Sequence, residues 1–362
     1  MHRLMAGVTI LEHELSELRL LVERQTGILL DCPNSALAAH VAEYLESEEL
    51  ESASALLERL RNVDGNPTIL PGFLDGVLNV STGFFRHPGA MNALAQQVIP
   101  QIYARKSEDG PCTLRIWSAG CGTGEEPYSI AMALSDSLAG GNGNGASGCA
   151  PDTKDKNGSR RSGGVTEGSV PSTPSCSTKE CSVHIVGSDL LPSSIEVAER
   201  GLYPQSALTG LPPAMIRASF SKIGNAGPVT AADSKANGSA AEARDGANGS
   251  GEGVRNGSGN GAHLLVKPRL RSLITFNTMN LTKPVYIGRF DCIFCMDVLP
   301  QLSRAQRTAL MERLHLYLEP GGYLFLSQTE KLCAPNLNFR QESYDGYTMH
   351  RKPMAASAAY GR

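Results

Sequence analysis

The sequence predicts an α/β protein, with a doubly wound, mostly parallel sheet behind a small helical domain. Three observations lead to this fold class. From residue 113 onward, near-continuously apolar runs alternate with helical patterns, as expected for parallel strands that helices bury on both faces. A three-glycine turn joins the first of these runs to a helix. Residues 1–75, in contrast, show leucines at three-to-four spacing, which is the period of a helix.

The elements of the larger domain follow from the same patterns. The expected strands are five apolar runs: Thr113–Ser118, Val183–Gly187, Leu273–Phe276, Phe290–Cys295 and Tyr323–Leu326. Ser303 and Gln306 have the spacing of a capping box, which predicts a helix running to about Leu318. The Pro320-Gly321-Gly322 run should stop that helix before the last strand.

Two segments interrupt this alternation. Residues 138–180 and 224–262 are rich in Gly, Asn, Ser and Ala, so we expect disordered insertions that bury too little apolar surface to offset their chain entropy. The first insertion explains the position of Asp189. An acidic residue should end the second strand roughly 20 residues after the glycine turn, and removing 138–180 brings Asp189 close to that spacing.

Composition narrows the class of protein. The net charge of −3 favours neither nucleic acid nor an acidic membrane as a partner. No apolar run approaches the ~18 residues of a transmembrane helix, and no secretory leader is apparent at the N-terminus. We therefore expect a cytoplasmic monomer that neither inserts into membranes nor binds nucleic acid.

The nine cysteines do not suggest a disulfide framework in so long a chain. Those in or beside apolar segments are expected to be reduced and buried: Cys32, Cys112, Cys121, Cys292 and Cys333. Cys292 and Cys295 form a C-x-x-C pair, but it lies inside a predicted strand, with no second pair at zinc spacing. We interpret it as core, and Cys176 and Cys181 in the polar linker as incidental.

The glycine turn carries the main functional signal. Residues 115–129 place an apolar strand before glycines 120, 122 and 124, and Glu125 and Glu126 follow at the start of a helix. Glycines let the backbone approach a ligand closely. A dinucleotide site would seat a phosphate at this helix N-terminus, which the two carboxylates would repel. They suit a ligand with an ammonium or sulfonium group, and this points to S-adenosylmethionine.

This segment resembles the first motif of the chemotaxis receptor methyltransferases, the CheR family. Further stretches match that family in order: residues 82–86 (Thr-Gly-Phe-Phe-Arg), 187–189 (Gly-Ser-Asp), 280–281 (Asn-Leu), 290–295 and 320–326. The resemblance covers roughly residues 70–350, apart from the insertions, and more loosely the N-terminal helices.

The resemblance implies a class I S-adenosylmethionine-dependent methyltransferase fold. It divides the chain into an N-terminal helical domain (1–75), a methyltransferase domain (76–352) and a tail (353–362). A small β-subdomain would span 213–268 and carry the second insertion in a hairpin. The implied reaction transfers a methyl group from S-adenosylmethionine to receptor glutamate carboxylates, giving glutamate 5-O-methyl esters and S-adenosylhomocysteine. No metal or covalent intermediate is implied.

The resemblance also assigns roles in the cofactor site. Asp189 would bind the ribose hydroxyls, or alternatively cap the next helix. Glu126 would hold the methionine ammonium. Glu125 could instead be a first-turn negative charge that the helix dipole favours. Asn280 and Leu281 would meet the adenine, unless Asn280 serves turn chemistry.

Arg86, supported by Thr82, would lie near the transferred methyl and act as the catalytic residue, and the resemblance also counts Thr82, Arg86, Met296 and Asp297 among the cofactor-binding residues. Its guanidinium could orient the substrate carboxylate, the alternative being a surface ion pair. His87 and His184 are assigned no role.

Two departures from the family pattern affect function. Met296 and Asp297 stand where the family has Arg-Asn beside the cofactor, and Gln301 stands in place of a tyrosine. Between Asp31 and Glu58 the chain has seven acidic residues and no Lys or Arg, whereas relatives carry a basic receptor-binding helix in this domain. That segment is either a solvated acidic face or a sign of a different docking surface.

Three functions stay open on sequence grounds. The leading hypothesis is an active protein-glutamate O-methyltransferase acting on chemoreceptors or a related signalling array. The first alternative is a catalytically degenerate CheR-like module that binds the cofactor or serves as a scaffold. The second is a small-molecule methyltransferase of the same fold, because fold alone does not fix function.

Overall fold

The computed structural model describes residues 10–62, 65, 67–78, 82–106, 112–140, 181–222, 263–284, 287–332, 334 and 336–354. Both expected insertions lie almost entirely outside these ranges, except that a helix continues to Gly140, past the expected boundary at 138. Most of the tail is also outside the described residues. No described helix is long and apolar enough to cross a membrane.

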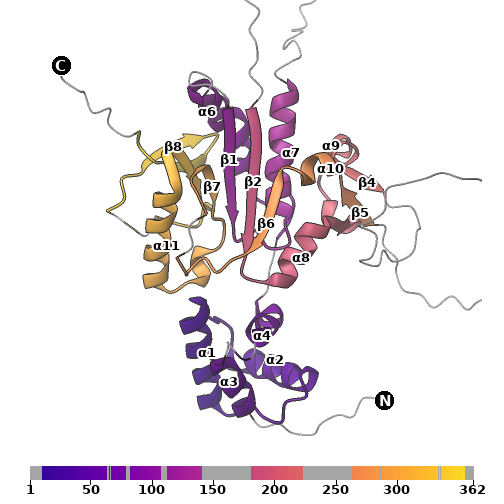
Figure 1. Cartoon of the computed structure of the whole chain (residues 1–362), viewed down its shortest axis with the longest axis vertical. Helices are drawn as coiled ribbons and strands as arrows, with labels where there is room; N and C mark the ends of the chain where they lie inside the picture. The colour runs from indigo at the N-terminus through magenta and orange to yellow at the C-terminus, as the bar shows by residue number, and fades with distance from the viewer. Residues whose placement is uncertain are drawn as a thin grey trace, which may run out of the picture.

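The N-terminal region forms a helical cluster with its own core. Its helices are α1 (Glu12–Thr26), α2 (Asn34–Ser47), α3 (Ala53–Arg61) and α4 (Ile69–Val77). The three-to-four spaced leucines bury against one another, including Leu15, Leu18, Leu56 and Leu60. The cluster lies at one end of the sheet (Figure 1).

The central sheet has seven strands in the order β6-β2-β1-β7-β8-β10-β9. They are β1 (Cys112–Ala119), β2 (Cys181–Asp189), β6 (Ile274–Thr278), β7 (Phe290–Phe294), β8 (Leu318–Phe325), β9 (Arg340–Tyr344) and β10 (Tyr347–Arg351). The first five pair in parallel, and β10 runs antiparallel between β8 and β9. All five predicted strands are confirmed, whereas the β9–β10 hairpin was not predicted.

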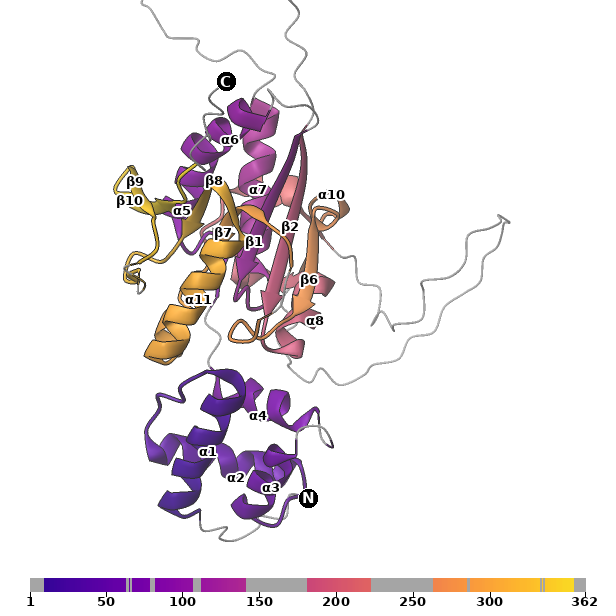
Figure 2. The same cartoon turned by 60° about the vertical axis from the view of Figure 1, so that its left-hand side comes forward.

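Helices cover both faces of this sheet. One face packs on α5 (Pro88–Ala93), a π-helical turn (Leu94–Val98), α6 (Ile99–Lys106) and α7 (Glu125–Gly140). The other packs on α11 (Arg304–Tyr317), while α8 (Pro192–Arg200) packs on β2 and β6. Figure 2 shows α7 and α11 on opposite sides. Successive side chains of a strand point to opposite faces, so Ile116 joins the α7 side and Trp117 the α11 side.

The expected capping box at the start of α11 is wrong in one respect. Ser303 is the N-cap residue, but its side chain makes no capping hydrogen bond. Helix α11 ends at Tyr317, and β8 begins at Leu318, so the Pro320-Gly321-Gly322 run lies inside a strand.

A smaller sheet stands beside the main one in the order β3-β5-β4. Its strands are β3 (Leu202–Pro204), β4 (Phe220–Lys222) and β5 (His263–Val266), all antiparallel. Two short helical segments, η2 (Gln205–Leu208) and α9 (Pro213–Ser219), lie between β3 and β4, and α10 (Pro268–Arg271) leads from β5 to β6 of the main sheet. Strands β4 and β5 pair across residues 223–262, which contain the second expected insertion.

The expectation for two cysteines is wrong. Cys112 and Cys181 form a disulfide between the first residues of β1 and β2, which are partners in the parallel register. Sequence distance concealed this pairing because the first insertion separates the two residues. The core assignment of Cys292 and Cys295 is confirmed, since both are free and buried. Cys176 and Cys333 lie outside the described residues.

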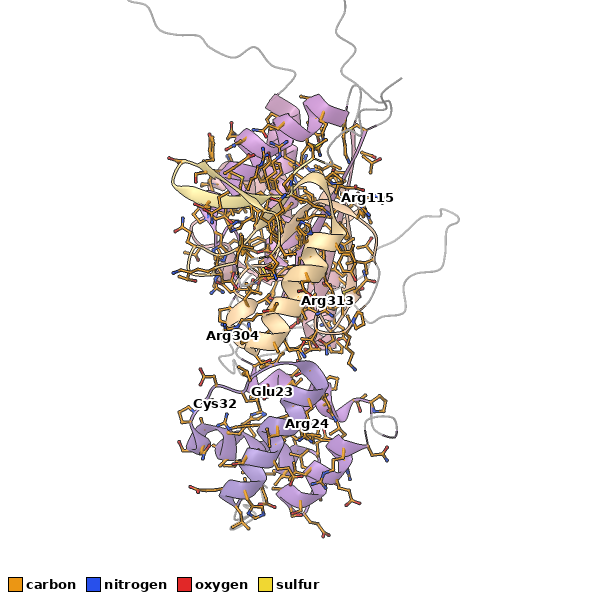
Figure 3. All side chains as sticks on the ribbon, turned by 90° about the vertical axis from the view of Figure 1, so that its left-hand side faces the viewer. Glu23, Arg24, Cys32, Arg115, Arg304 and Arg313 are labelled. Atoms are coloured by element: carbon orange, nitrogen blue, oxygen red, sulfur yellow. A yellow bond between two sulfur atoms is a disulfide. The ribbon has the colours of Figure 1, made fainter. Side chains whose placement is uncertain are left out.

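The N-terminal helices are tied to the carboxyl edge of the sheet through α1 and the segment after it. The Leu29 amide donates to the Gln301 carbonyl at 2.8 Å, and the Thr282 hydroxyl donates to the Thr26 carbonyl at 2.9 Å. Figure 3 shows Glu23 and Arg24 of α1 on the side of the N-terminal cluster nearest Arg304 of α11. We call this contact region between the N-terminal helices and the carboxyl edge of the sheet the seam. It bears on function because open α/β folds bind ligands at the carboxyl edge.

Candidate active site

A cavity of about 610 Å³ opens at the carboxyl edge of the sheet, beside the N-terminal helices. All eight predicted site residues line it: Thr82, Arg86, Glu126, Asp189, Asn280, Leu281, Met296 and Asp297. They come from the segment before α5, from α7 and from the ends of β2, β6 and β7. The structure thus brings together residues that lie up to 215 positions apart in the chain. Their individual roles stay predictions.

The glycine turn lines this cavity through residues 120–122. Gly120 and Gly124 have φ angles of +83° and +96°, which L side chains rarely adopt. A Cβ on Gly120 would lie 2.4 Å from a methyl of Val298, and one on Gly124 would lie 2.7 Å from the Cβ of Ala198. The turn therefore needs glycine both for its conformation and for its close packing.

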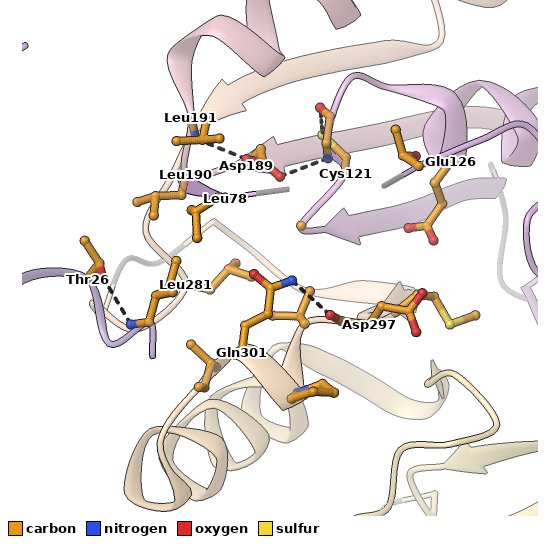
Figure 4. Close-up of a pocket in the computed structure, with 18 of the residues that line it drawn as sticks. Thr26, Leu78, Cys121, Glu126, Asp189, Leu190, Leu191, Leu281, Asp297 and Gln301 are labelled. Atoms are coloured by element: carbon orange, nitrogen blue, oxygen red, sulfur yellow. Dashed lines mark hydrogen bonds between the residues drawn. The ribbon is translucent and has the colours of Figure 1, made fainter. Parts of the chain in front are cut away.

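Asp189 binds the glycine turn with one carboxylate oxygen and the start of the next segment with the other. Its Oδ2 accepts from the Gly122 amide at 2.9 Å, and its Oδ1 accepts from the Leu191 amide at 3.1 Å (Figure 4). Leu191 is itself the N-cap of α8, so the alternative of Asp189 as the cap residue is wrong. Burial raises the pKa of Asp189, and these backbone bonds oppose that rise. The fixed carboxylate has acceptor capacity left for hydroxyl groups of a ligand.

Glu126 points into the same cavity. Its Oε1 accepts a hydrogen bond from Ser118 at 2.6 Å. The side chain is half-buried where it faces the cavity, and desolvation by the surrounding protein raises the pKa of Glu126 to about 7. Asp297 and Glu330 raise this pKa further through like-charge repulsion. A cationic group would relieve both effects.

Glu125 has a structural role in addition to its first-turn position. It is buried, and its Oε2 accepts from the Thr123 hydroxyl at 2.7 Å. Burial raises the pKa of Glu125, while side-chain hydrogen bonds with Thr123 and Thr82 lower it. Thr82 therefore supports the start of α7 as well as lining the cavity.

Asn280 and Leu281 line the cavity at the seam with the N-terminal helices. The Asn280 amide donates to the Gln25 carbonyl at 3.3 Å, and its oxygen accepts from the Thr282 amide at 2.9 Å. The turn chemistry left open for Asn280 is therefore present. Contact with adenine stays a prediction for both residues, and the apolar Leu281 side chain offers a face for a flat ring.

Arg86 reaches the cavity from a strained loop. Phe85 has a φ of +51°, which is rare for a bulky residue, and its amide donates to the Ser129 hydroxyl at 2.9 Å. Opposite it, Asp297 has a φ of +58°. An Arg86 nitrogen lies 3.3 Å from an Asp297 oxygen, so the ion pair that was the alternative for Arg86 exists, but inside the candidate site.

Met296 and Asp297 are positioned by a half-buried acid, Glu330, that sequence reasoning missed. One Glu330 carboxylate accepts from three backbone amides: those of Asp297 at 3.1 Å, Leu299 at 3.0 Å and Ser327 at 2.9 Å. Three such bonds fix the loop after β7 and direct Met296 and Asp297 into the cavity. No sequence motif marks Glu330, because the three backbone amides that bind it come together only when the chain folds.

Two further features of the cavity were missed. His87 was assigned no role, yet its Nε2 lies 3.0 Å from an Asp297 oxygen. Its position beside Arg86 was the available signal. The end of α1 at Thr26 and the segment after it, including Ile28 and Cys32, also line the cavity, although residue patterns before the first strand gave no hint of this.

The cavity fits S-adenosylmethionine in its chemistry. Carboxylates at Asp189 and Glu126 suit hydroxyl and ammonium groups, the glycine turn allows close approach, and apolar side chains such as Leu281 and Leu190 form the remaining wall. Desolvation and the neighbouring Asp297 and Glu330 carboxylates raise the pKa of Glu126 more than the nearby Arg86 lowers it, so the site favours an additional positive charge. A sulfonium and an ammonium supply that charge.

Comparisons with known proteins agree. A family model described as the S-adenosylmethionine-binding domain of CheR methyltransferase matches residues 80–157 and 254–348. Chemotaxis protein methyltransferase 1 of Pseudomonas aeruginosa is 26% identical over 336 residues, covering 89% of this chain and 95% of that protein. The chemotaxis protein methyltransferase of Vibrio parahaemolyticus is 25% identical over 334 residues, covering 91% and 93%.

Among solved structures, an O-methyltransferase family protein from Burkholderia thailandensis aligns at 9% identity, with a TM-score of 0.33, over 81% of this chain and 62% of that one. The fold assignment rests instead on the strand order. Five parallel strands ordered 3-2-1-4-5 and a final antiparallel hairpin make the S-adenosylmethionine-dependent methyltransferase fold, as predicted. Since the matches extend over both the sheet and the N-terminal helices, the chain belongs to the CheR methyltransferase family, with S-adenosylmethionine as its cofactor.

Proposed function

We propose that this protein transfers a methyl group from S-adenosylmethionine to glutamate side-chain carboxylates of chemoreceptor-type proteins. The observation that carries the proposal is the convergence of Arg86, Glu126 and Asp189 on one cavity at the carboxyl edge of the sheet. The relatives named chemotaxis protein methyltransferase support the choice of acceptor. The proposal includes the division into an N-terminal helical domain (1–75) and a methyltransferase domain (76–352).

The chain's part in this reaction is binding and orientation. When bound, S-adenosylmethionine supplies an electrophilic methyl group on a sulfonium sulfur. Asp189 would hold the ribose hydroxyls and Glu126 the ammonium, while Asn280 and Leu281 border the adenine. Arg86 would direct the acceptor carboxylate, because a guanidinium binds a carboxylate through paired hydrogen bonds.

No general base is needed, because a glutamate carboxylate is already ionised near neutral pH. The rate then depends on alignment of the reacting groups and on exclusion of water. The part of the cavity wall that comes from the segment between α1 and α2, including Ile28 and Leu30, provides some of that exclusion.

One observation favours the alternative of a cofactor-binding module without turnover. Met296 and Asp297 put an apolar side chain and a negative charge where relatives have Arg-Asn, and Asp297 is paired with the arginine proposed for catalysis. A negative charge beside the acceptor position opposes an incoming carboxylate.

Calorimetric titration with S-adenosylhomocysteine is the first test, because it needs no knowledge of the acceptor. Micromolar one-to-one binding supports the cofactor site, and Arg86→Ala should leave most of that binding intact. Methyl transfer is then measured with radiolabelled S-adenosylmethionine and chemoreceptor cytoplasmic domains, reading base-labile methyl esters. Label incorporation by the wild type that Arg86→Ala abolishes supports the enzyme. Cofactor binding without any incorporation supports the module.

Replacement of Met296, Asp297 and Gln301 by Arg, Asn and Tyr addresses the departures directly. Faster methyl transfer by this triple variant would show that the departures limit turnover. Asp345→Asn is the matched control for the change at 297, since Asp345 is also left-handed (φ +47°) but lies in an exposed turn.

The acceptor surface and the setting are proposals as well. We take the protein to act as a cytoplasmic monomer. The exposed acidic residues of α2 and the turn after it, such as Glu43, Glu46 and Glu49, would repel an acidic receptor segment. Docking would therefore use another face of the protein.

A further inference from the structure

Arg86, His87 and Asp297 form a polar cluster in the wall of the candidate active-site cavity. A single oxygen of Asp297, Oδ2, lies 3.3 Å from an Arg86 guanidinium nitrogen and 3.0 Å from His87 Nε2. The two sides of the cluster come from segments about 210 residues apart. Arg86 is the group that would direct the acceptor carboxylate, yet a carboxylate of the chain itself already meets it.

The backbone around Asp297 holds this arrangement in place. Asp297 is left-handed, with a φ of +58°, a backbone conformation that is uncommon for a residue other than glycine. Its amide donates to Glu330, and its carbonyl accepts from the Gln301 side chain at 3.1 Å. Phe85, next to Arg86, is left-handed as well. Strained residues of this kind persist where the surrounding structure over-determines them, and they gather at functional sites.

The electrostatic surroundings are already negative. Glu126 approaches the same part of the cavity as Asp297 (Figure 4), and the Asp297 charge contributes to the raised pKa of Glu126. A second carboxylate entering beside Asp297 meets that field, because like charges a few ångströms apart resist joint ionisation. It reaches the guanidinium nitrogen that Asp297 now contacts only by displacing Asp297.

On the basis of the proposed function, we infer that the Asp297 carboxylate occupies the place of the acceptor carboxylate at Arg86 and that the acceptor must displace it. Asp297 is then a specificity-determining residue. A free carboxylate competes poorly, whereas a glutamate delivered by a docked protein surface has further binding energy with which to displace Asp297.

The test uses the full chain saturated with S-adenosylhomocysteine and the α-amide of N-acetyl-L-glutamic acid as probe, which carries one γ-carboxylate. Its Kd is measured by NMR titration for the wild type and for Asp297→Asn, a near-isosteric change that tolerates the left-handed backbone. We expect about fivefold tighter probe binding by Asp297→Asn, the scale of a half-exposed ion pair. Adding Arg86→Gln to that variant should remove the gain.

Asp345→Asn is the control and should bind the probe like the wild type. If Asp297→Asn does not fold, Asp297→Gly serves instead, because glycine accepts the same positive φ. Equal probe affinity in the wild type and in the folded variant would overturn the inference, as would a gain that survives loss of Arg86. Failure of the wild type to bind S-adenosylhomocysteine would instead overturn the proposed function. In that case the probe titration is run on the ligand-free chain, so the two failures can be told apart.

Discussion

The raised pKa of Glu126 predicts that cofactor affinity depends on pH near neutrality. Glu126 has a pKa of about 7, mainly because of desolvation. Only its ionised form can pair with the ammonium of S-adenosylhomocysteine, which stays protonated below pH 8. With this pKa, about 10% of Glu126 is ionised at pH 6 and about 75% at pH 7.5. Affinity should therefore fall roughly eightfold from pH 7.5 to pH 6.

Calorimetry at pH 6, 6.5, 7 and 7.5 measures this slope directly. Glu126→Gln should flatten it and weaken binding at pH 7.5 by about 1.5–3 kcal/mol, the scale of a lost hydrogen bond to a charged group. Ser118→Ala removes a hydrogen bond that lowers the pKa of Glu126, so the midpoint should move to higher pH. Ser135→Ala, whose hydroxyl bonds within α7 at Ala131, is the control and should leave the curve unchanged.

The stability of the ligand-free protein should show the opposite dependence on pH. A carboxyl whose folded-state pKa is raised above 4.5 contributes stability below that pH and loses it as pH rises through about 7. Glu126→Gln should therefore raise Tm at pH 8 and leave it nearly unchanged at pH 4. A wild-type Kd that is constant from pH 6 to 7.5, or a slope that Gln preserves, would refute the reasoning.

Three further predictions concern the site and its frame. Asp189→Ala should weaken S-adenosylhomocysteine binding by about 1–3 kcal/mol in calorimetry, and unchanged affinity would remove Asp189 from the site. Cys112→Ser opens the bridge to Cys181 across 69 residues and should lower the free energy of unfolding by about 4 kcal/mol in denaturant titration. Dithiothreitol should bring the wild type to the same value, and no change in either would contradict the disulfide. Gly124→Ala should cost about 2–4 kcal/mol in thermal unfolding, whereas Gly346→Ala, left-handed but with open space around it, should cost only about 1 kcal/mol.

Much of the fold was predictable because it depends on local pattern. The five parallel strands are apolar runs with turns between them, and such runs are visible without tertiary information. The β9–β10 hairpin was not predictable in the same way. Its strand Arg340–Tyr344 is mostly polar and exposed at the edge of the sheet, so it lacks the apolar signal of a buried strand.

The gathering of the site residues followed from topology as well. Parallel strands present their carboxyl ends at one edge, so Gly120, Asp189 and Asn280 had to lie near one another once the strands were assigned. Contacts that depend on tertiary packing could not be predicted from the sequence. They include the hydrogen bonds of Glu330 to the loop after β7 and the position of the segment after α1 in the cavity wall.

By itself, the sequence determined the fold class, the family, the cofactor and eight of the residues that line the cavity, because apolar runs and short motifs encode these along the chain. The tertiary structure alone decided what faces Arg86. The Asp297 contact and the Cys112–Cys181 bridge each join residues that are remote in sequence. Such pairings depend on strand register and on backbone angles, which no local pattern specifies.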